Sequence, residues 1–293
     1  MRRLWYCVAH HLSGRYKHLK LIRRIYKLEL IYHYTSVAGL KGILGHDTPT
    51  IRVTDSRYLN DTNEILRGVE RATNEISQSL SAKRYEEPIP NTIEFMERII
   101  NSIGRSLFFT ASFCKEGDKL AQWVSYCPLN GGYSIGFDRV ALLACAEDNG
   151  FEIHDVNYNE EPYKFIASAA NVEHAIDAVE NQVERDLALY NLVPIAAREI
   201  ALTKDAKFET ENEVRLFSKR PSAEFALTGL DFFEKNSILV PFLPFSFPKN
   251  VVKKVIVGPM QHKELALQSL EMFKTAYGYD FTIEVSQVPL RQF

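Results

Sequence analysis

The stretch LIYHYTSVAGLKGIL, residues 30–44, joins a β-type run to a helical pattern. Aromatic and β-branched residues around His33 predict a strand, and Thr35 or Ser36 can cap the helix that follows it. In one interpretation the polar tips of the tyrosines and the histidine simply reach water. In the other, His33 faces a cleft and holds part of a ligand. The stretch alone leaves both interpretations open.

Strand-like and helical segments alternate through the rest of the chain, with no internal repeat and no long flexible linker. Helical patterns, such as DKLAQWVSY and KELALQSLEMFKTAYG, separate the predicted strands. We therefore expect one α+β domain over residues 29–293, with helices inserted between strands of a curved sheet. The strands are predicted at TIRVTDSRYL, SLFFTASF, GGYSIGFD, EVRLFSK, VVKKVIVGP and FTIEVSQV.

Composition describes an ordinary globular chain. Of its 293 residues, 46% are hydrophobic and 25% charged, which is enough to build a sizeable core. The formal charge of −2 gives no overall attraction to nucleic acid or membrane. Cys7, Cys114, Cys127 and Cys145 lie far apart without a Cys-x-x-Cys pair, so neither zinc nor a disulfide framework is indicated. No apolar run approaches the length of a membrane span, and we expect a cytoplasmic protein.

Residues 1–28 differ from this average, because they carry eight Lys or Arg and no acid. Apolar residues recur among them at near-helical spacing, which predicts a basic amphipathic helical extension. A helix packed on the core with a solvated basic face is the favoured interpretation. A surface for phosphates of a nucleic acid or for membrane headgroups is the alternative.

The common nucleotide-binding, hydrolase and zinc-protease signatures are absent. What remains is KFETENEVRLF, residues 207–217, in which Glu211, Glu213 and Arg215 alternate along a predicted strand. Side chains two apart on a strand share a face, so the three would point the same way. Two close carboxylates raise each other's pKa, and an adjacent guanidinium offsets this. Such a row forms either a solvated strand edge, which is the commoner case, or the wall of a site.

The order of these segments resembles a known family. YHYTSVAGLKGIL, TDSRYLND, FFTASFCKEGDKLAQWVSY, GGYSIGFD, ENEVRLF and VIVGP are similar to the signature segments of the bacterial DUF2971 family, over roughly residues 31–259. That family is grouped with the ADP-ribosyltransferase superfamily. The resemblance implies an ADP-ribosyltransferase-like split β-sandwich with NAD bound in its cleft.

The resemblance also implies roles for individual residues. The superfamily's signature takes His or Arg on the first strand, Tyr, Ser or Thr on a middle strand and Glu on a later one. His33 fits the first position and Glu213 the last, while the middle one is open among Thr110, Ser112 and Tyr133. Glu213 would stabilise an oxocarbenium-like sugar, and Glu211 would orient or deprotonate the acceptor. No metal is needed. The implied NAD-binding residues are His33, Tyr34, Thr35, Thr110, Ser112, Trp123, Tyr126, Tyr133 and Arg215, with Tyr133, Trp123 or Tyr126 stacking on nicotinamide.

The function implied by this resemblance is NAD-dependent transfer of ADP-ribose to a macromolecular acceptor. RNA, DNA and protein are all open as acceptors, and the resemblance suggests a toxin or antiphage defence effector with an antitoxin or regulatory protein as partner. The alternative is a catalytically degenerate nucleotide-binding or interaction module of the same fold. Release of nicotinamide from NAD would distinguish the two.

Overall fold

The computed structural model describes residues 29–58, 67–75, 78, 101, 109–128, 131–159, 161–164, 166, 183, 195–196, 198–218 and 229–289. The helical extension predicted at residues 1–28 lies outside these described residues. The chain divides into two compact units. The first combines the described residues of Met1–Asp47, Glu116–Cys145 and Phe247–Phe293, and the second those of Thr48–Lys115 and Ala146–Ser246.

The first unit contains strands paired in the order β10-β9-β4-β1. The pairs β1 with β4 and β4 with β9 are antiparallel, and β10 runs parallel to β9. Aromatic and β-branched residues dominate all of them, as the sequence predicts for strands. Their bounds are β1 Leu30–Thr35, β4 Tyr133–Asp138, β9 Val252–Val257 and β10 Thr282–Val285.

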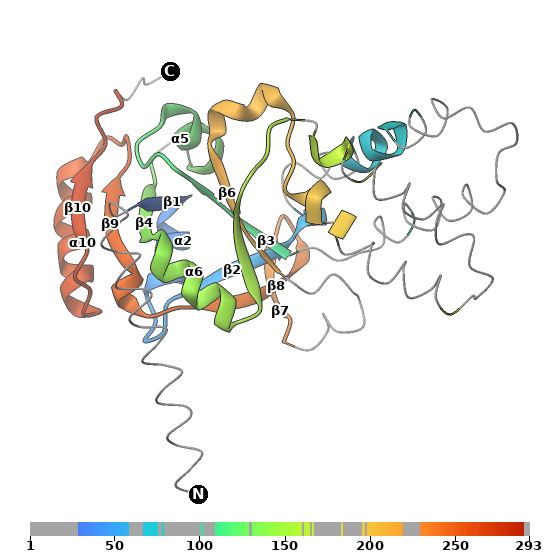
Figure 1. Ribbon diagram of the computed structural model, residues 1–293. Helices are drawn as coiled ribbons and strands as arrows, with labels where there is room; N and C mark the ends of the chain where they lie inside the picture. The colour runs from blue at the N-terminus through green and yellow to red at the C-terminus, as the bar shows by residue number, and fades with distance from the viewer. Residues whose placement is uncertain are drawn as a thin grey trace, which may run out of the picture. The chain divides into compact units, whose positions relative to one another are not determined.

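Helices precede or follow these strands in the chain. Ser36 is the N-cap of α2, Val37–Leu44, because its hydroxyl accepts a hydrogen bond from the Gly39 N–H at 3.1 Å. The helix α10, the longest among the described residues, lies along β9 and β10 and precedes β10 in the chain (Figure 1). The helix α6 follows β4 directly. The bounds are α2 Val37–Leu44, α5 Leu120–Tyr126, α6 Arg139–Asp148 and α10 Lys263–Ala276, with a 3₁₀ turn η3 at Lys249–Val251.

The second unit contains strands paired in the order β7-β8-β2-β3-β6-β5, and each of these pairs is antiparallel. All six residues of β6 are buried, which places this strand in the interior of the unit. The bounds are β2 Thr50–Asp55, β3 Phe109–Cys114, β5 Phe151–Asp155, β6 Glu213–Ser218, β7 Asp231–Lys235 and β8 Ile238–Ser246, with 3₁₀ turns η1 at Ser56–Tyr58 and η2 at Ala206–Glu211.

Each unit has its own apolar core built around an edge-to-face pair of rings. Phe137 and Phe247 meet at 5.4 Å between ring centres in the first unit, and Phe151 and Phe245 at 5.3 Å in the second. Both cores are completed by fully buried aliphatic side chains on the strands. These strands give each unit a side-chain scaffold that fixes the positions of the polar groups described below.

The structure is thus mixed α and β with mostly antiparallel pairing, which is compatible with the predicted α+β class. The finer expectation of an ADP-ribosyltransferase-like split β-sandwich stays a prediction. Among the helices of the described residues, none combines the length and the apolar character needed to cross a membrane.

Candidate functional site

A buried carboxylate at the start of β6 is the centre of the candidate site. The register of β3 and β6 places Ser112 opposite Arg215, beside Glu213. The Ser112 hydroxyl donates to Glu213 Oε1 at 2.6 Å, and Arg215 Nε donates to the same oxygen at 2.8 Å. The second guanidinium nitrogen of Arg215 donates to Oε2 at 2.9 Å. Glu213 and Arg215 lie on one strand face with a bidentate bond between them, as the alternation of residues on a strand predicts.

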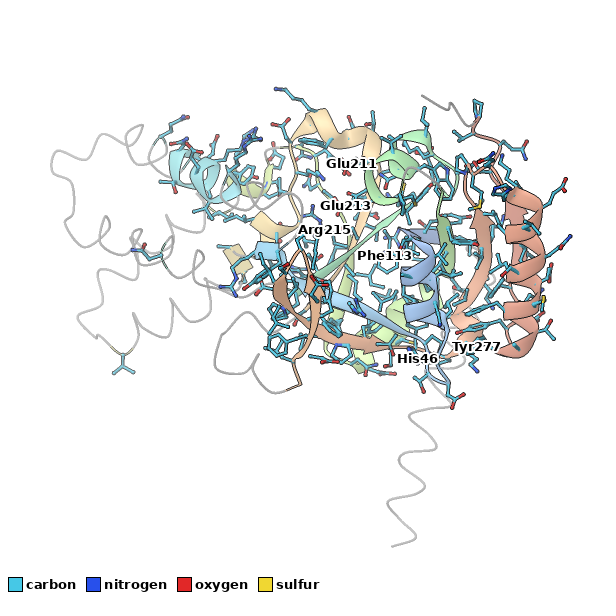
Figure 2. The ribbon with its side chains drawn as sticks, turned by 180° about the vertical axis from the view of Figure 1, so that it is seen from behind. His46, Phe113, Glu211, Glu213, Arg215 and Tyr277 are labelled. Atoms are coloured by element: carbon cyan, nitrogen blue, oxygen red, sulfur yellow. The ribbon has the colours of Figure 1, made fainter. Side chains whose placement is uncertain are left out.

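Lys204 adds a second cation from outside the strand. Its Nζ lies 2.7 Å from Glu211 Oε2 and 3.4 Å from Glu213 Oε2. The ammonium also lies 5.0 Å from the centre of the Phe208 ring, within reach of a cation–π contact. Figure 2 shows Glu211, Glu213 and Arg215 in succession from the end of η2 into β6. Glu211, Glu213, Lys204 and Arg215 therefore form one group of two carboxylates and two cations, which we refer to as the charged cluster.

The charges of this cluster decide the protonation state of Glu213. Burial by itself would raise the pKa of Glu213, but the Arg215 charge and hydrogen bonds, the Lys204 charge and the Ser112 hydrogen bond lower it to about 2. The carboxylate is therefore ionised at neutral pH. Since its side chain is only 5% exposed, this negative charge is held in a site largely closed to water.

Tyr158 joins the cluster to a pocket. Its hydroxyl accepts a hydrogen bond from the backbone N–H of Glu213 at 2.9 Å, and burial raises the pKa of Tyr158 to about 12. The phenol is therefore protonated at neutral pH. The pocket has a volume of about 640 Å³, within the usual range for small-molecule sites, and is lined by Asp155, Val156, Asn157, Tyr158, Asn159 and Glu209.

Glu211 differs from the prediction, because it does not lie on the strand. It is the last residue of η2, and Asn212 follows it in a left-handed conformation with φ of 47° before β6 begins. This turn interrupts the extended backbone, so the alternation predicted for three residues holds only for Glu213 and Arg215. The carboxylate of Glu211 still reaches the cluster, through its ion pair with Lys204.

The three candidates for the middle position have different surroundings. Ser112 contacts Glu213 directly. Thr110, two residues earlier on β3, has a buried hydroxyl with no hydrogen-bond partner within the described part of the chain. Tyr133 lies on β4 in the first unit, where burial raises its pKa. Ser112 is therefore the candidate whose contact with Glu213 the geometry supports.

The predicted residues of the first unit gather around an aromatic pair. The Tyr34 ring meets the Trp123 ring edge-on at 4.7 Å between centres. The Tyr34 hydroxyl donates to the Glu116 carbonyl at 2.9 Å, and Trp123 Nε1 donates to Asp118 Oδ1 at 2.7 Å. Both rings are buried and tie β1 and α5 to the segment between β3 and α5. We refer to Tyr34, Trp123 and Asp118 as the aromatic cluster.

Other predicted ligands of NAD in the first unit differ in exposure. His33 is half-buried on β1, opposite Ile135 of β4. Thr35 is buried, and its carbonyl accepts a weak hydrogen bond from the Cys127 thiol at 3.5 Å. Of the three rings predicted to stack on nicotinamide, Trp123 and Tyr133 are buried, whereas Tyr126 is 39% exposed. Tyr126 is thus the most accessible of the three to a nicotinamide ring.

The structure brings together Ser112, Glu211, Glu213 and Arg215 in the second unit. His33, Tyr34, Thr35, Trp123, Tyr126 and Tyr133 lie in the first unit. A single NAD site that unites the two sets stays a prediction. In the part of the chain that is described, no group of three or more His, Cys, Asp or Glu side chains is arranged to hold a metal ion.

Sequence reasoning missed two members of the cluster. Lys204 and Tyr158 belong to no motif, and folding rather than spacing brings them to Glu213. One signal was available for Lys204: two neighbouring carboxylates and one arginine leave a negative charge that a buried site cannot carry without a second cation. That reasoning predicts a lysine or arginine near the site but does not identify which one.

Comparison with protein families gives a match over the middle of the chain. A model of the DUF2971 family, described as a protein of unknown function, matches residues 122–216. The matched segment runs from α5 to β6 and includes Lys204, Glu211, Glu213 and Arg215. The match supports the family resemblance drawn from the sequence motifs and assigns no activity. No curated protein and no solved structure matches the chain.

Proposed function

We propose that the protein is an NAD-dependent ADP-ribosyltransferase that modifies a macromolecular acceptor. The observation that carries this proposal is the hydrogen bond from Ser112 to an ionised Glu213, because it joins two of the three signature positions implied by the family resemblance. His33 on the first strand supplies the remaining position. A toxin or antiphage defence effector, with an antitoxin or regulatory partner, is the setting that the resemblance suggests.

The proposed reaction breaks the bond between ribose C1′ and the nicotinamide nitrogen. The bonding electrons leave with nicotinamide, which becomes neutral, and the sugar becomes oxocarbenium-like. A carboxylate held ionised close to this sugar stabilises its developing positive charge. Glu213 meets this requirement, because its low pKa keeps the charge in place at neutral pH.

The acceptor then forms a bond to C1′ and loses a proton. Glu211 is suited to receive this proton, because its side chain is more exposed than that of Glu213 while its carboxylate remains in the same cluster. RNA, DNA and protein acceptors all carry hydroxyl or nitrogen nucleophiles of this kind. The basic segment of residues 1–28 would contact phosphates if the acceptor is a nucleic acid.

A second candidate function has its own supporting observation. Both oxygens of the Glu213 carboxylate already accept hydrogen bonds. Oε1 accepts from Ser112 and Arg215, and Oε2 accepts from Arg215 and Lys204. A carboxylate this well satisfied also serves to hold β3 and β6 together. That arrangement favours a catalytically degenerate nucleotide-binding or interaction module of the same fold.

Release of nicotinamide from NAD by the purified protein tests the proposal. Glu213→Gln keeps size and hydrogen bonding but removes the charge, so we expect the rate to fall by about a hundredfold or more. The matched control is Glu271→Gln on the exposed side of α10, which should retain the parental rate. Parental activity of Glu213→Gln would contradict the assigned role.

If the wild-type protein releases no nicotinamide, the degenerate module is favoured. Thermal unfolding with and without NAD then distinguishes a nucleotide-binding module from an interaction module. NAD at a hundred times its dissociation constant would add about 2.7 kcal/mol to the free energy of unfolding of a nucleotide-binding module. A pure interaction module would show no shift.

A further inference from the structure

Lys204 is the one lysine of the charged cluster, and its surroundings fix it closely. Its backbone N–H donates to the Asn157 carbonyl at 2.9 Å, while the Asn157 N–H donates to the Leu202 carbonyl at 2.8 Å. The side chain is 2% exposed and its ammonium faces the Phe208 ring. A lysine held this way presents its charge at a defined point, although lysine is rarely buried so completely.

Glu211 depends on this lysine more than Glu213 does. Glu213 is oriented by β6, by Ser112 and by the bidentate bond to Arg215. Glu211 ends the 3₁₀ turn η2 and precedes a left-handed residue, so no strand directs its side chain. Its ion pair with Lys204, at 2.7 Å, is also the shorter of the two that the lysine makes. Arg215 therefore balances Glu213, and Lys204 balances Glu211.

We infer that Lys204 is a positioning residue that holds the Glu211 carboxylate beside Glu213 for proton transfer from the acceptor, an inference that rests on the proposed function. Without this cation, Glu211 loses the 2.7 Å ion pair that directs its carboxylate. A Glu211 carboxylate that is no longer held at this point is poorly placed to accept a proton from the acceptor. Among the described residues, the Lys204 ammonium faces Glu211 and Glu213, and its charge also acts on the Tyr158 hydroxyl.

The pH dependence of nicotinamide release from NAD, with water as acceptor, tests this role. Lys204→Met should lower kcat at neutral pH by about a hundredfold, as expected for a misplaced catalytic group, and should leave the KM for NAD nearly unchanged. The acid limb of its pH profile should move to higher pH. Lys204→Arg should restore most of the rate and the parental profile. The control Lys207→Met, at an exposed lysine of the same segment, should match the wild type.

A double-mutant cycle shows whether Lys204 acts through Glu211. Adding Lys204→Met to Glu211→Gln removes one charge of each sign, which also protects the fold against an unpaired buried charge. The rate of this double variant should equal that of Glu211→Gln alone. A further loss equal to that of Lys204→Met in the parental protein would overturn the inference, as would a Lys204→Met protein with the parental kcat and pH profile.

A titration that needs no turnover separates this inference from the proposed function. Carboxyl ¹³C signals of Glu211 and Glu213 report their protonation directly. In Lys204→Met the Glu213 signal should titrate at higher pH than in the wild type, because the Lys204 charge lowers the pKa of Glu213. The Glu211 signal should shift at neutral pH because its ion pair is lost, whether or not the protein releases nicotinamide. Absent turnover with shifted titrations would overturn the transferase and keep the charge coupling. Unchanged titrations would overturn the role of Lys204.

Discussion

The aromatic cluster of the first unit and the charged cluster of the second stabilise their strands by different interactions. Each ties a strand to neighbouring segments at a place where the sequence predicts part of a site. Tyr34 and Trp123 do so with ring packing and with hydrogen bonds to a carbonyl and to a half-buried carboxylate. Glu213 and Arg215 do so with buried ionised groups. Rings tolerate changes of similar shape, whereas buried charges tolerate no loss of a partner.

The difference matters for function as well as for stability. A buried ion pair responds to pH and to the number of its partners, and it provides a fixed field at the place where charge develops in a reaction. An aromatic pair excludes water and sets the position of the backbone around it. Variants that remove a charge from one cluster or a ring from the other therefore test whether the two clusters contribute differently to stability.

The largest expected effect is that of Arg215→Ala. This change leaves Glu213 charged and buried with fewer partners, and removing one member of a buried pair costs about 3–5 kcal/mol in the free energy of unfolding. Chemical denaturation followed by circular dichroism measures the change. If this variant does not fold, Arg215→Lys, which keeps the charge but not the bidentate geometry, should show a smaller loss.

The control for Arg215→Ala is an exposed ion pair. Lys164 lies 3.1 Å from Glu161, and both side chains are more than half exposed. Lys164→Ala should therefore change the free energy of unfolding by less than about 1 kcal/mol. Equal losses in the two variants would show that the charged cluster contributes no more than a surface pair, and the contrast between the two clusters would disappear.

Much of the strand pattern of both clusters could be predicted from the sequence. Alternation and β-branched or aromatic content predict β1, β3, β4 and β6 and place Glu213 and Arg215 on one face. The strand β8 is not predicted, because Pro241 and Pro244 remove backbone donors and argue against a paired strand. Both prolines nevertheless lie in the ladders, opposite Phe232 of β7 and Arg52 of β2.

The candidate site shows where such reasoning ends. Period-two alternation extends the strand back to Glu211, but the left-handed Asn212 stops it, and asparagine adopts that conformation readily enough that the sequence allows both outcomes. The choice of Ser112 over Thr110 depends on the register between β3 and β6. Lys204 and Tyr158 are brought to Glu213 by tertiary folding. Charge balance predicts a second cation near the site, but local patterns identify neither residue.

The second effect is a dependence of stability on pH to which the charged cluster contributes through Glu213. The pKa of Glu213 is lowered in the folded protein from 4.5 to about 2. A group with a lowered folded-state pKa contributes stability that is fully present above the unfolded value and is lost as pH falls towards the folded value. The free energy of unfolding should therefore decrease between about pH 4.5 and pH 2 in part because of Glu213.

Glu213→Gln isolates this contribution. Its absolute stability is also lower, because Arg215 and Lys204 lose a charged partner, so the quantity to compare is the slope of stability against pH. Reversible denaturation at several pH values below 5 should give a flatter slope for Glu213→Gln than for the wild type. Parallel slopes in the two proteins would mean that Glu213 titrates equally in the folded and unfolded chains.

The smallest effect is expected for Trp123→Phe in the aromatic cluster. The phenyl ring still meets Tyr34, but the hydrogen bond from Trp123 Nε1 to Asp118 is lost. Asp118 keeps its bonds from the Ser286 hydroxyl and the Gln287 N–H, so it is not left unsatisfied. We therefore expect a loss of about 1 kcal/mol in the free energy of unfolding, by the same denaturation measurement.

Trp123→Ala provides the comparison within the same position. It removes the ring itself and should cost about 3–5 kcal/mol, close to the loss expected for Arg215→Ala. Because the Trp123 ring is buried, Trp123→Phe should also leave unchanged the stabilisation by NAD that the proposed function predicts. A Phe variant that loses as much stability as the Ala variant would show that the indole hydrogen bond, and not ring packing, holds the aromatic cluster. A Phe variant that loses only its response to NAD would instead assign the indole to nicotinamide, since a packing role predicts no such loss.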